Sequence, residues 1–214
     1  MRTLNTTLTW VAEGTALCRT AIDDLDEAAY GAPSLLPGWT RKHVVAHLAG
    51  NAEAIGNLLH WARTGEPTPM YSSREQRNAA IESGATLPGD RLSAWFAESA
   101  QALADAMAGL TAEQWQAEVV TAQGRTVPAS EVPWMRSREV MVHVVDLGTG
   151  VRFADLPAEF LAELRDDILA RRGRDNVPAV HGRPAEVTAF LAGRPFAGVT
   201  TADGAPAEPL APWL

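Results

Sequence analysis

The spacing of apolar side chains predicts a mostly helical protein. Apolar residues recur three and four positions apart over long stretches, as they do on one face of an α-helix. Clusters of Gly, Pro and Ser separate these stretches. The expected helices cover residues 4–30, 40–64, 74–83, 88–107, 111–119, 133–147, 156–172 and 186–193. Four of the helices before residue 150 are long, which favours an antiparallel four-helix bundle.

Several helix ends carry capping residues. Thr40 is placed to cap the second long helix at its start, and Gly65 can end it in a left-handed conformation. Ser73 is placed to cap the short helix that follows. Thr111 with Gln114 has the spacing of a capping box. Residues 121–131 are predicted to form a loop that can include a short extended piece.

The composition changes near residue 150. The chain before this point holds the long apolar helices, whereas residues 156–172 are amphipathic and strongly charged. From Pro195 onward the sequence is rich in Gly, Pro, Ala and Thr. We therefore expect a main domain over residues 1–150 and a small second domain over residues 151–214.

The stretch Pro133–Leu147 combines a buried helix with a charged stripe. It is apolar nearly all round, which is typical of a buried helix. Arg136, Glu139, His143 and Asp146 recur at spacings of three, four and three, so they lie on one stripe. Buried charges are costly unless they are paired or bind a metal. Glu139 and His143 are one turn apart and can reach one point.

A second histidine pair lies in the helix over residues 40–64. His43 and His47 are one turn apart, and a bundle can bring His47 against Glu139 and His143. Such pairs are common on helices and usually bind nothing. Here, however, the Glu139/His143 pair lies in a buried helix, and the His43/His47 pair lies in another helix of the same bundle. A metal site is therefore our working hypothesis. Two histidines and a carboxylate leave an open coordination position and suit zinc or ferrous iron. The protease pattern HExxH is absent, so peptide hydrolysis is not indicated.

Composition excludes several classes of function. The net charge of −8 and the pI near 5.1 do not suit nucleic-acid binding. No stretch is long and apolar enough to span a membrane, and the N-terminus lacks a signal-peptide core, so a cytoplasmic protein is expected. Cys18 is the only cysteine and lies among apolar helical residues, which indicates a buried thiol. A monomer is favoured, although the sequence does not fix the oligomeric state.

Several segments in the same order resemble mycothiol-dependent maleylpyruvate isomerases. The segments are LLPGWTRKHVVAHLAGNAEA, LLHWARTGEPTPMY, TAQGRTVPASE and WMRSREVMVHVVDLG, with AGRPFAGVTTADG near the C-terminus. The resemblance implies a DinB-like four-helix bundle with a small C-terminal α/β appendage. Between about Arg171 and Pro184 this chain looks shorter than the family, so we expect a shortened appendage and an altered substrate pocket.

The resemblance also implies a set of functional residues. It assigns zinc, or another divalent metal, to His47, Glu139 and His143, and leaves His43 out. The functional arginine of the family corresponds to Arg194. Further candidates for contacts with cofactor or substrate are Arg136, Arg125 and Asn51, for each of which an ordinary structural hydrogen bond is an equal alternative.

The implied reaction is the cis–trans isomerisation of maleylpyruvate to fumarylpyruvate in gentisate-type aromatic breakdown. A metal-bound thiolate from mycothiol adds reversibly to the double bond and allows rotation. Arg194 is expected to bind a carboxylate of the anionic substrate and to stabilise the enolate. One alternative is a mycothiol- or bacillithiol-dependent S-transferase acting on another electrophile. A second alternative is a metal-binding domain without catalytic activity.

Overall fold

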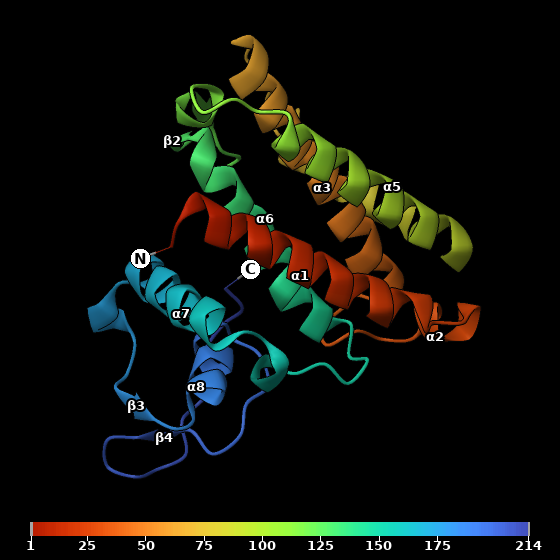
Figure 1. Ribbon diagram of the computed structural model, residues 1–214. Helices are drawn as coiled ribbons and strands as arrows, with labels where there is room; N and C mark the ends of the chain where they lie inside the picture. The colour runs from red at the N-terminus through yellow and green to blue at the C-terminus, as the bar shows by residue number, and fades with distance from the viewer. Residues whose placement is uncertain (1, 214) are drawn as a thin grey trace. The chain divides into compact units, whose positions relative to one another are not determined.

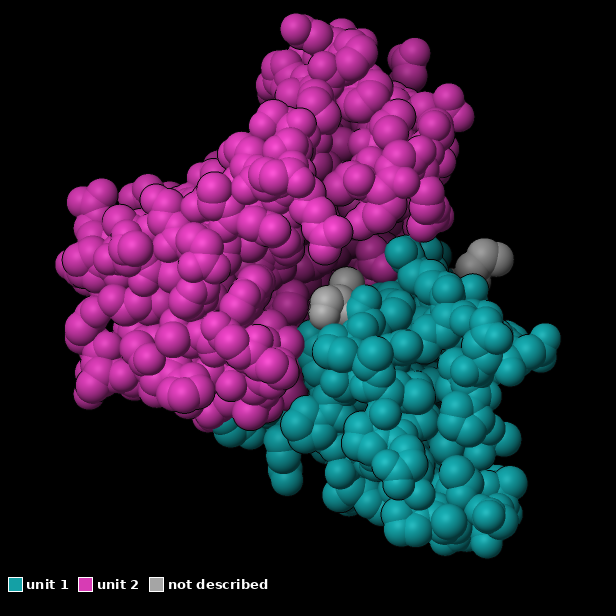
Figure 2. Space-filling model, turned by 180° about the vertical axis from the view of Figure 1, so that it is seen from behind, with its two compact units in different colours: residues 1–2, 150–214 teal, residues 3–149 magenta. Residues whose placement is uncertain are grey.

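The computed structural model describes residues 2–213, which form two compact units (Figure 1, Figure 2). The helical unit covers residues 3–149, and the C-terminal unit comprises residue 2 with residues 150–213. The helical unit contains α1 Leu4–Asp23, α2 Glu27–Gly31, α3 Arg41–Thr64, α4 Arg74–Gly84, α5 Gly89–Ala108, the 3-10 turn η1 Gln114–Gln116, β1 Glu118–Val120, β2 Thr126–Pro128, η2 Ala129–Glu131 and α6 Val132–Asp146. The C-terminal unit contains η3 Phe153–Asp155, α7 Ala158–Arg172, η4 Arg174–Asn176, β3 Val180–His181, α8 Pro184–Leu191 and β4 Thr200–Thr201.

Four long helices form the bundle of the helical unit. The α1 helix packs against α6 and α5, and α3 packs against α5, α6 and the short helix α4 (Figure 1). Apolar residues from all four fill the interior, as the periodicity predicts. Part of this core consists of Val11, Ala52, Ile55, Leu58, Leu59, Leu103, Met107 and Val132. The expected mainly helical four-helix bundle is therefore present.

The predicted caps of α3 and α4 are confirmed. Thr40 precedes α3 in extended conformation, and Gly65 ends it with φ of 76°, the left-handed region that glycine adopts without strain. The Ser73 hydroxyl accepts the backbone N–H of Gln76 at the start of α4. These local signals place α3, and with it one wall of the functional site.

The first predicted helix is divided into two helices in the structure. The helix expected over residues 4–30 is divided, because α1 ends at Asp23 and the Asp26 carboxylate caps α2 by accepting the N–H of Ala29. Three aspartates lie between Asp23 and Asp26, and acidic groups destabilise the C-terminus of a helix.

The helix expected over residues 111–119 is wrong apart from its first turn. The capping box forms, since Gln114 accepts the N–H of Thr111, but only the short turn η1 follows. The chain then enters β1, where the buried Val119 pairs with Val127 of β2. Packing of the β-branched side chains against the bundle core prevails over the local helical signal.

The C-terminal unit is a small α/β arrangement. Its helices α7 and α8 pack together, and β3 pairs antiparallel with β4 so that Val180 lies opposite Thr201. The rings of Phe190 and Phe196 pack edge to face at a centroid distance of 5.3 Å. Among residues 2–213, no helix is long and apolar enough to cross a bilayer.

The close approach of α1 and α6 depends on Gly14. A Cβ atom at this position would lie 2.5 Å from Cγ2 of Val140 and 3.1 Å from Cγ of Met141. Val140 is fully buried and cannot move away. We expect Gly14→Ala to lower the free energy of unfolding by about 1–3 kcal/mol, measured by chemical denaturation.

Gly56→Ala is the matched control for this substitution. Gly56 lies inside α3, and a Cβ there meets nothing within 4 Å. Alanine favours helices over glycine, so this variant should gain up to about 1 kcal/mol. Equal gains in both variants would contradict the tight contact between α1 and α6.

Candidate functional site

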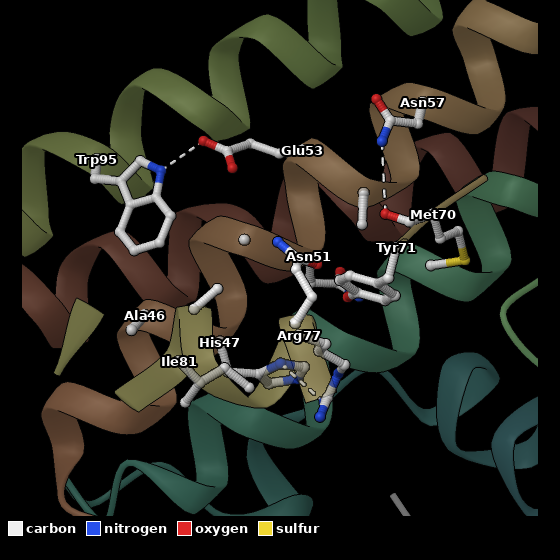
Figure 3. Close-up of a pocket in the computed structure, with 14 residues that line it drawn as sticks. Ala46, His47, Asn51, Glu53, Asn57, Met70, Tyr71, Arg77, Ile81 and Trp95 are labelled. Atoms are coloured by element: carbon white, nitrogen blue, oxygen red, sulfur yellow. Dashed lines mark hydrogen bonds between the residues drawn. The ribbon is translucent and has the colours of Figure 1, made fainter. Parts of the chain in front are cut away.

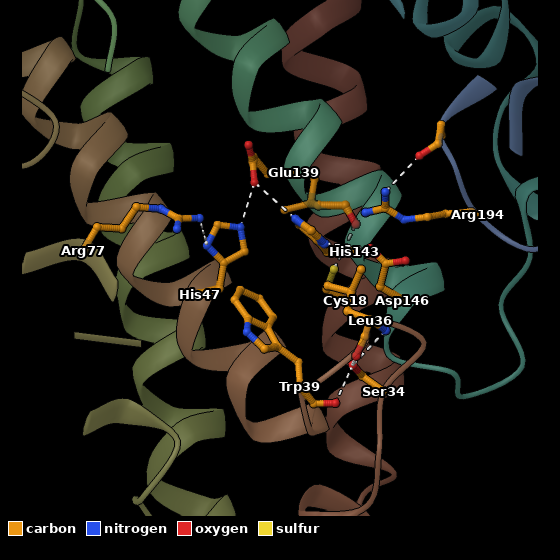
Figure 4. A network of polar contacts seen from close by, with 12 residues as sticks. Cys18, Ser34, Leu36, Trp39, His47, Arg77, Glu139, His143, Asp146 and Arg194 are labelled. Atoms are coloured by element: carbon orange, nitrogen blue, oxygen red, sulfur yellow. Dashed lines mark hydrogen bonds and ion pairs between the residues drawn. The ribbon is translucent and has the colours of Figure 1, made fainter. Parts of the chain in front are cut away.

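Two helices bring the three predicted metal ligands together. His47 comes from α3, and Glu139 and His143 come from α6. One donor atom from each lies within 4.8 Å of the other two (Figure 4). Oε2 of Glu139 lies 2.9 Å from Nε2 of His47 and 3.4 Å from Nε2 of His143. The site is thus formed by one imidazole nitrogen from each histidine and one carboxylate oxygen.

The three side chains are fixed by the helices that carry them. His47 is 4% exposed and His143 is 3% exposed, and their rings meet edge to face at a centroid distance of 4.8 Å. Trp39, in the loop before α3, covers His47 with its ring centroid 5.7 Å away. Burial on rigid elements restricts the rotamers, so the donor atoms are held in place before any ligand arrives.

The electrostatics of the trio favour a neutral His47 and an ionised Glu139. Burial lowers the pKa of His47 to about 4, with a smaller opposing effect from the hydrogen bond to Glu139. Burial alone would raise the pKa of Glu139, but the hydrogen bonds with His143 and His47 outweigh it and hold this pKa well below its usual range. The neutral imidazole and the carboxylate are the forms that bind a metal ion.

The outer nitrogens of the two histidines have different neighbours. Nδ1 of His143 donates to the carboxylate of Asp146 at 2.8 Å. Burial acts to lower the pKa of His143, yet the bonds to Asp146 and Glu139 raise it overall. Nδ1 of His47 instead faces a guanidinium, because Nη2 of Arg77 on α4 lies 3.3 Å away (Figure 4).

These residues fit a divalent metal ion. Two imidazole nitrogens and one carboxylate oxygen are the ligand set of catalytic zinc centres, and the same set suits other divalent metals. The bond from His143 to Asp146 is the carboxylate–histidine arrangement that orients a metal-binding ring. Three protein ligands would leave a coordination position for an added molecule.

A pocket opens beside His47 on the side of α4 (Figure 3). Its wall combines aromatic and polar side chains from α3, α4, α5 and the loop before α4. The side chains that line it include those of His47, Asn51, Glu53, Asn57, Tyr71, Gln76, Arg77 and Trp95. Any molecule that enters this pocket meets the His47 edge of the trio.

The other residues predicted to contact the cofactor or substrate lie in different environments. Asn51 lines the pocket, and its Oδ1 accepts a hydrogen bond from Nη1 of Arg136 at 2.8 Å. Arg136 itself has no exposed surface, so it supports Asn51 from inside the bundle. Arg125 is exposed on the turn between β1 and β2, where its backbone pairs with Thr121. The assignment of these residues to a thiol cofactor remains a prediction.

His43 has a structural role and lies outside the trio. The backbone N–H of Thr40 donates to its Nδ1 at 3.2 Å, and its Nε2 lies 3.5 Å from Glu82. In the C-terminal unit, Arg194 is buried, and its Nη1 donates to the carbonyl of Ala192 at 2.9 Å. Its assignment to the substrate remains a prediction.

Sequence reasoning did not identify three residues beside the trio. Trp39, Tyr71 and Arg77 lie in loops or on a polar helix, where no periodic pattern distinguishes them. Asp146 belonged to the recognised stripe but had no assigned role. Trp39 and Tyr71 lie in segments that resemble a family, whereas Arg77 lies outside those segments and had no signal.

Comparison with known proteins gives a consistent result. Residues 11–148 match the family model of the mycothiol maleylpyruvate isomerase N-terminal domain. The crystal structure of the mycothiol-dependent maleylpyruvate isomerase aligns with a TM-score of 0.90 at 40% identity, over 98% of this chain and 99% of that chain. A histidine-to-alanine variant of that enzyme aligns with the same TM-score at 39% identity, again over 98% and 99%. No curated protein sequence matches.

A more distant structure shares the fold alone. YfiT from Bacillus subtilis, described as a probable metal-dependent hydrolase with an unusual four-helix bundle topology, aligns with a TM-score of 0.54 at 17% identity, over 68% of this chain and 85% of that chain. At this identity the likeness supports the bundle and says nothing about chemistry.

The alignment with the isomerase structure covers almost the whole of both chains, so it includes the C-terminal unit. The shortening expected between Arg171 and Pro184 stays a prediction. With a family model that covers most of the bundle and a 40% identical structure that covers nearly the entire chain, this protein belongs to the mycothiol-dependent maleylpyruvate isomerase family.

Proposed function

We propose that this protein isomerises maleylpyruvate to fumarylpyruvate with mycothiol as its thiol cofactor, as a step of gentisate-type aromatic breakdown. The observation that carries the proposal is the convergence of His47, Glu139 and His143 in a chain that aligns end to end with an isomerase of this kind. A divalent metal ion at the trio, zinc in our proposal, would keep the thiol of mycothiol deprotonated. This thiolate would add reversibly to the double bond, so that the resulting single bond could rotate.

The chain contributes binding and orientation to this chemistry. His47, Glu139 and His143 would hold the metal, and Asp146 fixes the ring of His143 through Nδ1. The neighbouring pocket receives the thiol cofactor beside Trp95, Tyr71 and Asn51. Arg194 binds one carboxylate of the substrate and stabilises the negative charge that develops on addition.

The decisive assay uses the zinc-loaded protein with maleylpyruvate, in the presence and absence of mycothiol. Formation of fumarylpyruvate only when mycothiol is present is the expected result. A stable thiol adduct of the substrate would indicate an S-transferase instead. Unchanged substrate with both zinc and mycothiol would contradict catalysis and favour a metal-binding domain.

Cys18 is expected to be dispensable for the reaction. Its thiol is fully buried, donates to the carbonyl of Val140, and has a pKa raised to about 12 by burial, against a smaller opposing effect of Arg136. A protonated thiol in the core is a poor nucleophile. Cys18→Ala should keep the mycothiol-dependent rate while losing about 1 kcal/mol of stability with the hydrogen bond.

Steady-state kinetics and denaturation on this variant check the prediction. Loss of turnover in folded, metal-loaded Cys18→Ala protein would show that the chain supplies its own nucleophile.

A further inference from the structure

Arg77 is an unpaired cation in the wall of the pocket beside the trio. It lies on α4, is half-buried, and faces His47, with its guanidinium carbon 5.9 Å from the ring centre of Tyr71 (Figure 3). Arg77 also donates a hydrogen bond to the amide oxygen of Asn78. Within residues 2–213, no carboxylate pairs with it. A guanidinium in this position can bind an anion in a protein whose net charge is −8.

The guanidinium of Arg77 lies directly beside the candidate metal site. Its Nη2 is 3.3 Å from Nδ1 of His47, one of the three candidate ligands. An anion bound by Arg77 would therefore lie next to the trio.

We infer that Arg77 is a carboxylate receptor of the pocket, which holds an anionic substrate next to the trio. The inference rests on the proposed function for the identity of the substrate. A substrate with two carboxylates needs two cationic partners. Arg77 supplies the one in the pocket, and its planar fork suits bidentate binding of a carboxylate. Arg77 is therefore a residue that determines specificity for anions.

The test compares Arg77→Met with Arg74→Met in two titrations. Arg74 is exposed at the start of the same helix and does not line the pocket, so its variant controls for the loss of one charge from α4. Zinc affinity is measured by competition with a chromophoric chelator. Maleate binding to the zinc-loaded, thiol-free protein is measured by calorimetry, with maleate as a simple cis dicarboxylate.

The two titrations have different expected results. Arg77→Met should bind zinc as tightly as Arg74→Met, because neither arginine belongs to the three candidate ligands. It should bind maleate about 10- to 100-fold more weakly, because a charge-assisted contact is lost. Arg77→Lys keeps the charge without the planar fork and should bind maleate with intermediate affinity.

Other outcomes decide against the inference. Weaker zinc binding with unchanged maleate binding in Arg77→Met would mean that Arg77 only positions the ring of His47. Equal behaviour of Arg77→Met and Arg74→Met in both titrations would remove any role in the pocket. The proposed function is tested by a separate measurement. If the wild type does not isomerise maleylpyruvate, the proposed function fails. The titrations of the Arg77 variants still decide whether Arg77 binds a dicarboxylate in this pocket.

Discussion

Replacing His143 by alanine is expected to remove the divalent metal ion from this protein. The wild type should bind close to one ion per chain at the trio, and His143→Ala leaves only His47 and Glu139 as ligands. Loss of an outer partner of a ligand weakens metal binding by about 10- to 100-fold, and loss of the ligand itself should cost more than this. His47→Ala should have the same effect. Elemental analysis after dialysis measures the metal content directly.

His43→Ala is the matched control for both variants. His43 lies one turn before His47 on α3, but its ring interacts with the backbone of Thr40 and with Glu82. This variant should keep its metal and lose only some stability at the start of α3, about 1 kcal/mol from the cap. Full metal content in His143→Ala, or loss of metal in His43→Ala alone, would show that the trio is not the metal site.

The candidate site was visible in the sequence because its ligands follow helical geometry. A spacing of four residues on an apolar helix places Glu139 and His143 side by side, and the structure has them 3.4 Å apart. His47 could be added because α3 is long, well capped and on the same bundle. The spacing within one helix follows from its period alone, whereas the contact between α3 and α6 required the bundle.

The environment of the site was not visible in the same way. Arg77 lies on α4, a helix with only two buried residues, Ile81 and Gly84, and nothing in its pattern distinguishes one arginine from another. Tyr71 and Trp39 lie in loops, whose paths depend on turns and packing rather than on a period. Contacts of this kind are set by tertiary structure, so a single sequence does not reveal them.

The errors in secondary structure have a similar origin. Thr111 and Gln114 do form the predicted capping box, yet the helix stops after one turn. Val119 is fully buried opposite Val127, and burial of these β-branched residues in a hairpin stabilises the chain more than a continued helix would. Local signals are reliable for where an element begins, while packing decides how far it extends.

Arg194→Ala is expected to impair turnover strongly without removing the metal. Arg194 follows α8 in the C-terminal unit, whereas all three ligands of the trio lie on α3 and α6. If Arg194 binds a substrate carboxylate and the developing enolate, its loss should cost about 2–4 kcal/mol of transition-state stabilisation, comparable to removal of an oxyanion donor. Arg194→Lys keeps the charge but loses the planar fork, so it should remain substantially impaired.

Burial of Arg194 requires a control for structural damage. Its Nη1 bonds to the carbonyl of Ala192, so its truncation should lower the free energy of unfolding by about 1 kcal/mol. Arg183 precedes the other end of α8 and is exposed beside Glu186, which makes Arg183→Ala the matched variant. Steady-state kinetics, metal content and denaturation are measured on the wild type and on the Arg194→Ala, Arg194→Lys and Arg183→Ala variants. Because the substrate is an anion and this protein is acidic, wild-type turnover in folded Arg194→Ala would mean that a cation other than Arg194 binds this carboxylate.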